Sequence, residues 1–356
     1  MRSQPETCTA IGFLLDYFMT EVSNASTKEA TQIITHQREV VLYDMIGSGL
    51  ALTHRAFEAL DLESGKLDVE QTPLCWVMME KQCSAAVQQK LVEYARSGGK
   101  LILAGRMCVE DFDHEPCTIL QDALGVRKIH TDPPFTHTEI HAFDHRDIPV
   151  SFVEDYAGDF DEVYATRPDG QTVGFTKSLG KGKVLMYGAA MAANTLDDLD
   201  VVHQMALKMD CPVPFELSCW VDVRMSRGPK GRFLFINNYQ DDPVQTTVSY
   251  RGEMLFGGNP VSLAARTGAI LPLDWQIKEG LVLQYATSEL VEVIEDGAQV
   301  VLKTAQEEFF AGLSLSGYTC DQDVADSRMP GHTELHGKEG SITLTKLVTS
   351  ADTSAR

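Results

Sequence analysis

The stretch LCWVMMEKQCSAAVQQKLVEYARSGGKLIL, which runs from Leu74 to Leu103, predicts the fold of this 356-residue chain. Its first six residues are almost wholly apolar, as expected of a strand that helices cover on both faces. Ser84 is a suitable N-cap for the helix that follows, and the apolar residues at 87, 91, 94 and 95 share one face of that helix. Two glycines at 98 and 99 then supply a left-handed turn before a second apolar run. The stretch therefore predicts one strand–helix–strand unit of a parallel α/β sheet.

Similar signals extend over residues 1–212, which we predict to form one α/β domain with a mostly parallel sheet and helices on both faces. The turn sequences at 167–170 and 180–182 separate three predicted strands between 161 and 189. The other predicted elements are strands over 10–18, 56–62, 74–79 and 100–104, and helices over 39–46 (ending near Gly47 and Gly49), 116–124 (with Pro116 in the first turn and Gly125 at the end) and 195–209.

The composition changes after the linker Cys211-Pro212-Val213-Pro214. Beyond it we find only short runs of β-branched and apolar residues, which Gly, Pro, Asn and Asp separate. This pattern predicts a small antiparallel β-sandwich over residues 213–295 and further β-structure over 296–348, for which an incomplete second sandwich is one interpretation. The tail from 349 to 356 is predicted to be disordered.

Charge and cysteine content restrict the class of protein. The formal net charge is −21, from 51 acidic and 30 basic side chains, so nucleic acid and anionic membrane surfaces are poor partners, and a neutral sugar or a protein fits better. We recognise neither a signal peptide nor an apolar run long enough to span a membrane. The eight cysteines form no CxxC pair and stand mostly beside apolar residues. Reduced thiols in a cytoplasmic protein are the expected interpretation.

Six pieces of sequence carry a resemblance to a known family. They are LLDYFMTE (14–21), FEALDL (57–62), VQQKLVEYARSGGKLIL (87–103), PCTILQDALG (116–125), LAARTGAILPL (263–273) and YATSELVEV (285–293). In order and spacing they resemble the region after the catalytic barrel in bacterial β-galactosidases of glycoside hydrolase family 35, and more distantly family 42. The resemblance implies a flavodoxin-like, class I glutamine amidotransferase-like α/β domain followed by a small antiparallel β-sandwich.

The resemblance also bears on function, because the two catalytic glutamates of such enzymes belong to the (β/α)8 barrel. A barrel needs about 250 residues, and no part of this sequence resembles one. The resemblance thus implies a non-catalytic accessory or oligomerisation subunit, or a fragment, of a β-galactosidase-type enzyme without a cofactor. Its expected partners are a separately encoded catalytic barrel, further copies of the same chain, and possible β-galactoside ligands.

Cys108 is a candidate nucleophile. A class I amidotransferase needs a cysteine on a strained elbow between a strand and a helix, with a histidine and a carboxylate nearby. Here the elbow would follow the strand at 100–104, but Cys108 lies beyond it and no glycine follows. The chemical hypothesis takes His130 or His137 as the base. The favoured alternative is a structural cysteine in an inactive loop.

A histidine-rich segment is a candidate metal site. His137, Glu139 and His141 would share one face of a strand, and two histidines with a carboxylate can bind zinc. His130 and His145 flank the segment. The same sequence, FTHTEIHAF, is also that of an ordinary edge strand with a polar face, and we favour this second interpretation.

Acidic residues follow the predicted first and fourth strands of the sheet. Asp16, Tyr17 and Glu21 follow the first, and Glu110 and Asp111 follow the fourth. The carboxyl ends of parallel strands are where such folds bind ligands. We assign none of these side chains to bond cleavage and expect them to face substrate, a partner's barrel or a neighbouring subunit.

Four aromatic residues of the predicted sandwich leave a third function open. Trp220, Tyr239, Trp275 and Tyr285 could stack on a sugar if exposed, although we expect them to pack in a core. The accessory subunit is thus the preferred hypothesis. A carbohydrate-binding protein without turnover and a stand-alone hydrolase that uses Cys108 are the alternatives.

Overall fold

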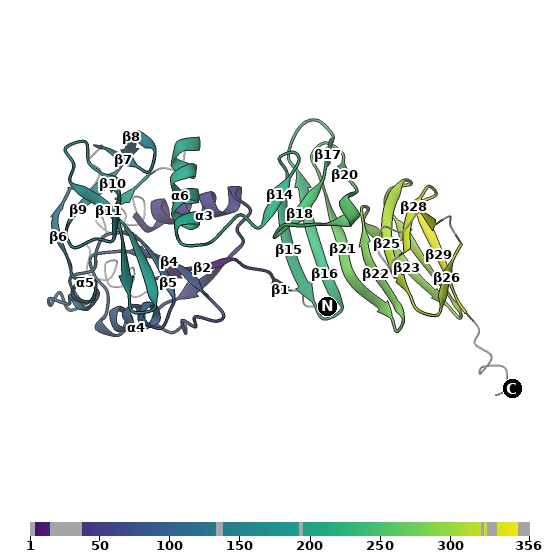
Figure 1. Cartoon of the computed structure of the whole chain (residues 1–356), viewed down its shortest axis with the longest axis horizontal. Helices are drawn as coiled ribbons and strands as arrows, with labels where there is room; N and C mark the ends of the chain where they lie inside the picture. The colour runs from purple at the N-terminus through teal and green to yellow at the C-terminus, as the bar shows by residue number, and fades with distance from the viewer. Residues whose placement is uncertain are drawn as a thin grey trace, which may run out of the picture. The chain divides into compact units, whose positions relative to one another are not determined.

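The computed structural model describes residues 4–14, 38–132, 138–191, 195–321, 324–325 and 333–347. The chain divides into two compact units. The α/β unit comprises Thr7–Pro212, and the β unit comprises Met1–Glu6 together with Val213–Arg356 (Figure 1). Within the described ranges, none of the helices combines the length and the apolar character that crossing a membrane requires.

Five parallel strands form the centre of the α/β unit, in the order β3-β2-β4-β5-β12. Six of six residues of β4 are buried, which confirms the strand predicted from its apolar run. The bounds are Thr9–Phe13 for β2, Phe57–Asp61 for β3, Leu74–Met79 for β4, Lys100–Gly105 for β5 and Gly182–Tyr187 for β12. The first strand is shorter than predicted, since it ends at Phe13, and positions 15–18 lie outside the described residues.

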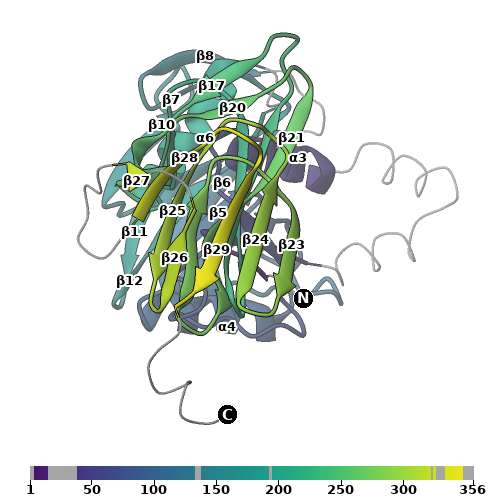
Figure 2. The same cartoon turned by 90° about the vertical axis from the view of Figure 1, so that its right-hand side faces the viewer.

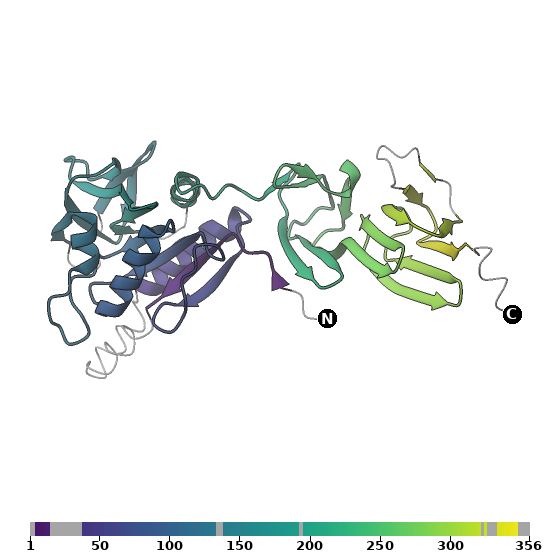
Figure 3. The same ribbon diagram turned by 60° about the horizontal axis from the view of Figure 1, so that its bottom comes forward.

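Two pairs of helices cover the two faces of this sheet (Figure 3). Helices α3 (Arg38–Leu52) and α6 (Leu196–Lys208) pack on one face, and α4 (Ala85–Arg96) and α5 (Ile119–Leu124) on the other. Ser84 caps α4 as predicted, because its Oγ accepts the N–H of Val87 at 3.2 Å. Helix α5 begins three residues later than Pro116, which instead forms an isolated bridge with Glu110.

The predicted end of α3 is wrong, because the helix continues through Gly47 and Gly49 to Leu52. Gly49 allows α3 and α6 to approach each other closely. A Cβ atom at position 49 would lie 2.5 Å from Cγ1 of Val202 on α6. This glycine therefore serves a helix–helix contact, which sequence alone does not distinguish from a helix stop.

An antiparallel extension continues the sheet beyond β12, so that the described part of the α/β unit holds twelve strands in one sheet. The predicted edge strand is wrong in its position, because β7 lies between β10 and β8. Four of these strands, β6, β8, β9 and β13, were not predicted from the sequence. The bounds are Val126–Thr131 for β6, Thr138–Ala142 for β7, His145–Val150 for β8, Phe152–Gly158 for β9, Glu162–Thr166 for β10, Thr172–Leu179 for β11 and Ala189–Ala190 for β13.

An eight-stranded antiparallel sheet, in the order β1-β15-β16-β21-β22-β25-β28-β27, organises the described part of the β unit. Figure 2 shows its strands β21, β25, β28 and β27. The bounds of these strands are Gln4–Pro5, Asp222–Gly228, Gly231–Asn238, Thr267–Lys278, Leu281–Ala286, Phe309–Leu315, Thr333–Gly337 and Val324–Ala325. Two hydrophobic cores pack against this sheet. Strands on either side of position 295, where we predicted a division, thus pair within one sheet through β22 and β25.

Smaller sheets complete the two cores of the β unit. The first core uses the sheets β14-β18-β19 and β17-β20 with the short helix η1, and the second uses the sheet β23-β24-β29-β26. The bounds are Phe215–Leu217 for β14, Val244–Thr246 for β17, Val248–Tyr250 for β18, Glu253–Met254 for β19, Phe256–Gly258 for η1, Val261–Leu263 for β20, Leu290–Asp296 for β23, Gln299–Thr304 for β24, Tyr318–Cys320 for β26 and Ser341–Lys346 for β29. The predicted fold class, an α/β unit followed by antiparallel β-structure, is confirmed.

The contact between α3 and α6 predicts the effect of a methyl group at position 49. Gly49→Ala should lower the free energy of unfolding by about 1–3 kcal/mol, because the added Cβ overlaps Val202. This sign is opposite to the gain of up to about 1 kcal/mol that alanine brings in an exposed helix. Urea unfolding followed by circular dichroism measures the difference, with Ser48→Ala as the control in the same helix. An equal or raised stability of Gly49→Ala would contradict the close contact.

Candidate functional site

The carboxyl ends of the parallel strands form the candidate site. The chain order reverses between β2 and β4, and such a switch point is the usual ligand site of an open α/β sheet. Asp16, Tyr17 and Glu21, which follow β2, lie outside the described residues. The loops after β4 and β5 are joined to each other, because Val109 N–H donates to Lys81 O at 2.8 Å and Cys83 N–H to Glu110 O at 2.9 Å. The described part of the site therefore consists of two loops, after β4 and after β5, that backbone hydrogen bonds hold together.

Cys108 lies in the loop after β5, but its side chain is fully buried. A hydrogen bond with the Cys83 thiol, together with burial, raises the pKa of the Cys108 thiol well above its usual value. Nucleophilic cysteines need the opposite, an accessible thiol with a lowered pKa. His130 pairs with Asp132 at 3.2 Å, and His137 is outside the described residues. The structure thus shows Cys108 in the surroundings of a core residue.

Glu154 of β9 accepts a hydrogen bond from a backbone N–H group of the loop after β5. Its Oε1 accepts the N–H of Met107 at 2.6 Å and the hydroxyl of Tyr156 at 2.9 Å, and its Oε2 accepts the hydroxyl of Thr131 at 2.7 Å. The side chain is 0% exposed, and burial raises its pKa above the usual range of a carboxyl group. The Met107 N–H group, next to the expected elbow, is therefore already bound by a side chain of the sheet, that of Glu154.

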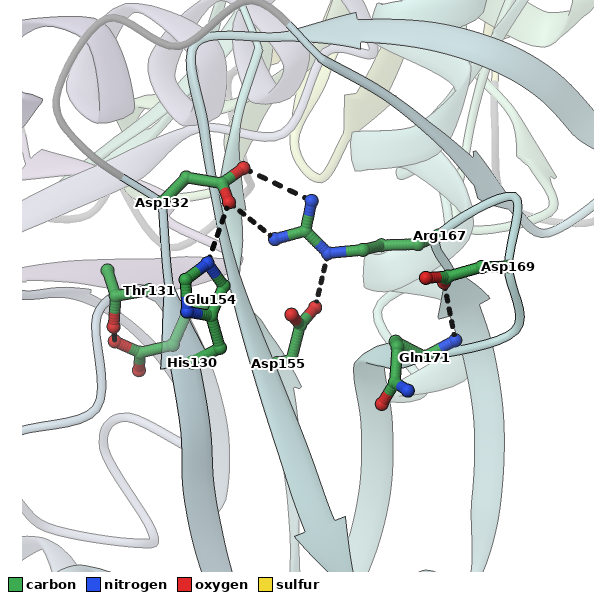
Figure 4. A network of polar contacts seen from close by, with 8 residues as sticks. All are labelled: His130, Thr131, Asp132, Glu154, Asp155, Arg167, Asp169 and Gln171. Atoms are coloured by element: carbon green, nitrogen blue, oxygen red, sulfur yellow. Dashed lines mark hydrogen bonds and ion pairs between the residues drawn. The ribbon is translucent and has the colours of Figure 1, made fainter.

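An ion network adjoins Glu154 (Figure 4). Arg167, in the turn between β10 and β11, donates through Nε to Asp155 at 2.6 Å and binds both oxygens of Asp132 at 2.9 and 3.1 Å. Burial alone would lower the pKa of Arg167, but the hydrogen bonds to these two carboxylates raise it. The network holds β6, β9 and the β10–β11 turn together, as a buried pair with good geometry can do.

The predicted zinc ligands do not converge in the described part of the chain. Glu139 is exposed, His141 Nδ1 lies 3.8 Å from Asp147, and His145 Nε2 lies 2.8 Å from Asp200. Among the described residues there is no group of three or more side chains suited to a metal ion. His137, the remaining candidate ligand, is outside them.

The acidic residues of the loop after β5 are used within the loop. Asp111 Oδ1 accepts the backbone N–H groups of Asp113 at 2.9 Å and Glu115 at 3.0 Å. Glu110 lies 3.6 Å from Lys81 and 3.7 Å from His114. These contacts give the carboxylates a part in shaping the loop, and their role toward a ligand or partner stays a prediction.

The aromatic residues of the β unit divide into two classes. Trp275 and Tyr285 pack beside the two cores, as expected. The expectation is wrong for Trp220 and Tyr239, whose side chains are 48% and 60% exposed. Their neighbours Val221 and Asn238 are buried, and this alternation could have indicated exposure once the covered face of the sheet was known.

Glu154 and Arg167 were not singled out from the sequence. The segment FVEDYAG of β9 places two acidic residues inside an apolar run, and this is the one signal that could have found them. Buried charges in a strand need partners from other strands, and those partners become known only from the fold.

The fold is an α/β unit with a mainly parallel sheet, followed by antiparallel β-sheets, and comparison with known proteins supports this fold class. Residues 25–160 match the family model described as the second domain of GLMA-like proteins. The structure resembles a catalytic mutant of the GH42 β-galactosidase Gan42B from G. stearothermophilus, with a TM-score of 0.60 and 15% identity over 76% of this chain and 40% of the other. A β-galactosidase from Bacillus circulans sp. alkalophilus has the same TM-score, with 11% identity over 76% of this chain and 42% of the other.

The curated relatives act on sugars, as their names state. A β-1,2-glucosyltransferase of Ignavibacterium album is 21% identical over 70% of this chain and 36% of its own length. An exo-β-D-glucosaminidase of Pyrococcus horikoshii is 26% identical over 67% of this chain and 31% of its own length. The chain therefore spans about a third of the relatives that it matches. Gan42B is a GH42 enzyme, and family 42 is the one that the sequence resemblance ranks as the more distant. The finer assignment to family 35 stays a prediction.

The burial of Cys108 predicts its reactivity. In the folded chain, iodoacetamide should modify the half-buried Cys219 and Cys320 and leave Cys108 unmodified, because a buried thiol with a raised pKa forms little thiolate. Peptide mass spectrometry after alkylation with and without urea measures this difference. Rapid modification of Cys108 in the folded chain would revive the hypothesis of a cysteine hydrolase.

The burial of Glu154 predicts a pH-dependent effect of Glu154→Gln. The pKa of Glu154 is higher in the folded chain than in the unfolded chain, so its stabilising contribution is complete below the unfolded pKa and is lost as the pH rises through the folded pKa. As the pH rises above the unfolded pKa and through the folded pKa, the variant should therefore gain stability relative to the wild type. Urea unfolding across this range measures it. A difference that does not change with pH would mean that Glu154 keeps one ionisation state.

Proposed function

We propose that this chain is a non-catalytic accessory module of a β-galactosidase-type glycoside hydrolase, which assembles with a separately encoded catalytic barrel, with copies of itself, or with both. The observation that carries the proposal is the fold: both units together resemble about 40% of a GH42 β-galactosidase. The chemistry of the described site agrees with it. Cys108 is buried, and Glu154 fills the adjacent backbone donor.

Such a module acts on chemistry indirectly. An accessory domain can form one wall of a sugar pocket, exclude water from it and hold the subunits in register, so that a substrate is oriented without contact to the scissile bond. The predicted contact residues are those at the carboxyl edge of the parallel strands, Asp16, Tyr17, Glu21, Glu110 and Asp111. A reducing cytoplasmic location is part of the same proposal, since all eight cysteines are free.

Carbohydrate binding without turnover is the second candidate function. The exposure of Trp220 and Tyr239 favours it, because exposed rings of this size are available for stacking. The stand-alone cysteine hydrolase is the weakest of the three hypotheses, since it requires an accessible thiolate at Cys108.

A reconstitution assay tests the accessory role. Hydrolysis of a chromogenic β-galactoside is measured for the purified chain, for a barrel encoded by an adjacent gene, and for their mixture, with co-elution in size-exclusion chromatography as a second readout. We expect a stable complex and activity that is higher in the mixture than in either component. Activity of the chain alone, or the failure of the two proteins to associate, would overturn the proposal. Glu110→Gln with Asp111→Asn tests whether the β5 loop contributes to association, and the exposed Glu139→Gln is the control.

A further inference from the structure

Trp220 and Tyr239 form an exposed aromatic pair at one end of the eight-stranded sheet. Trp220 precedes β15 and Tyr239 follows β16, and these strands pair with Asp222 opposite Asn237. Continuing this register places position 220 opposite position 239. A hydrogen bond of 2.7 Å from Gln240 Nε2 to Trp220 O holds the two chain segments together beyond the last ladder pair.

Both rings stand on the face of the sheet that points away from the first core of the β unit. Val221 and Asn238 are 0% and 1% exposed and point inward, so their neighbours in an extended chain point outward. The exposed fractions of 48% for Trp220 and 60% for Tyr239 agree with this direction. By contrast, Trp76 is fully buried and Trp275 packs beside the second core. Trp220 is thus the most exposed of the three tryptophans of the chain.

Polar groups on the same face lie next to the two rings. Asn237 Nδ2 lies 3.4 Å from Asp222 Oδ2, and Arg224 lies 3.5 Å from Asp222 Oδ1. These contacts are long, so the three side chains keep capacity for stronger hydrogen bonds to a ligand. On the neighbouring strand β21, Gly268 pairs with Asn237, and a Cβ atom at position 268 would lie 2.3 Å from Asn237 Oδ1, so the amide packs over this glycine.

The buried side chain of Asn238 holds the turn after Tyr239 in place. The buried side chain of Asn238 donates to Asp242 O at 2.8 Å and to Ala264 O at 3.0 Å, and its oxygen accepts the N–H of Gln240 at 3.0 Å. One buried amide thus ties the turn to the chain before β21. A platform that is held in this way loses little entropy when a ligand binds.

We propose that Trp220 and Tyr239, with Asp222, Arg224 and Asn237, form a binding platform for a neutral hexose oligosaccharide. The aromatic faces would stack on the apolar C–H faces of the sugar rings, and the carboxylate, guanidinium and amide would bind pairs of hydroxyl groups. The net charge of −21 opposes a polyanionic ligand. The charged and amide groups beside the rings suit a ligand rich in hydroxyls better than the apolar anchor of a protein partner. This proposal requires no barrel and rests on the second candidate function, carbohydrate binding without turnover, for which it names the site and the ligand class.

Binding of cellohexaose and of a β-1,4-galactan hexasaccharide to the full chain tests the platform. Titration calorimetry is combined with tryptophan fluorescence, because burial of Trp220 under a sugar should shift its emission to shorter wavelength. We expect Trp220→Ala and Tyr239→Ala each to weaken binding about tenfold. Met254→Ala, at an exposed apolar residue of the same unit, is the control and should bind as the wild type does. Trp220→Phe should retain part of the affinity and lose the fluorescence shift.

Each outcome has a separate meaning. The absence of binding to both oligosaccharides in the correctly folded chain would overturn the platform and leave the accessory role intact. A wild-type chain that self-associates in sedimentation velocity, with dissociation in Trp220→Ala, would show that the aromatic pair is a protein interface and would also overturn it. Binding to a glucosamine hexasaccharide only, with loss at high salt, would indicate attraction of a cation to an acidic protein in place of stacking. Circular dichroism of each variant establishes that the β unit is folded.

Discussion

The burial of β4 and β5 on both faces is the constraint on which the α/β unit depends. All six side chains of β4 are buried, and they alternate between two hydrophobic cores. Trp76 and Met78 pack toward α3 and α6, whereas Cys75 and Val77 pack toward α4 and α5. Each large apolar side chain removed from water contributes about 1.5–3 kcal/mol. A strand of this composition is stable only if both faces are covered, and parallel strands with crossover helices provide that cover.

The same constraint determines where a reactive site would lie in such a sheet, which is at the carboxyl ends of the parallel strands. Parallel strands bring their carboxyl ends to one edge, where amidotransferase-type folds place the reactive elbow. Here the Met107 N–H at that edge is bound by Glu154, and the neighbouring thiol of Cys108 is enclosed in the core. A buried carboxylate that accepts three hydrogen bonds is held in place by its donors. The described part of this edge is therefore organised by internal partners.

Local elements could be predicted well from the sequence. Features that depend on which residues pack against a given face of a helix or sheet could not. The strand at 74–79 and the Ser84 cap could be predicted because their signals lie within a few residues. The end of α3 could not be predicted, because Gly49 packs closely against Val202, which is more than 150 residues away in the chain. Likewise β7 has the alternation of an edge strand but receives β8 as a further neighbour. The exposure of Trp220 required knowledge of which face of the β unit is filled.

Selected polar and aromatic groups of the two units differ in how complete their contacts are within the folded chain. In the α/β unit, the described carboxylates near the expected elbow are bound by backbone and hydroxyl donors or by Arg167. In the β unit, by contrast, two large rings stand outside the cores beside polar groups with long contacts. Free energy available for recognition resides in groups whose interactions are incomplete in the folded chain, because satisfied groups must first lose their partners. The incomplete contacts beside Trp220 and Tyr239 are therefore the reason to propose these described residues of the β unit as a place where a small ligand is recognised.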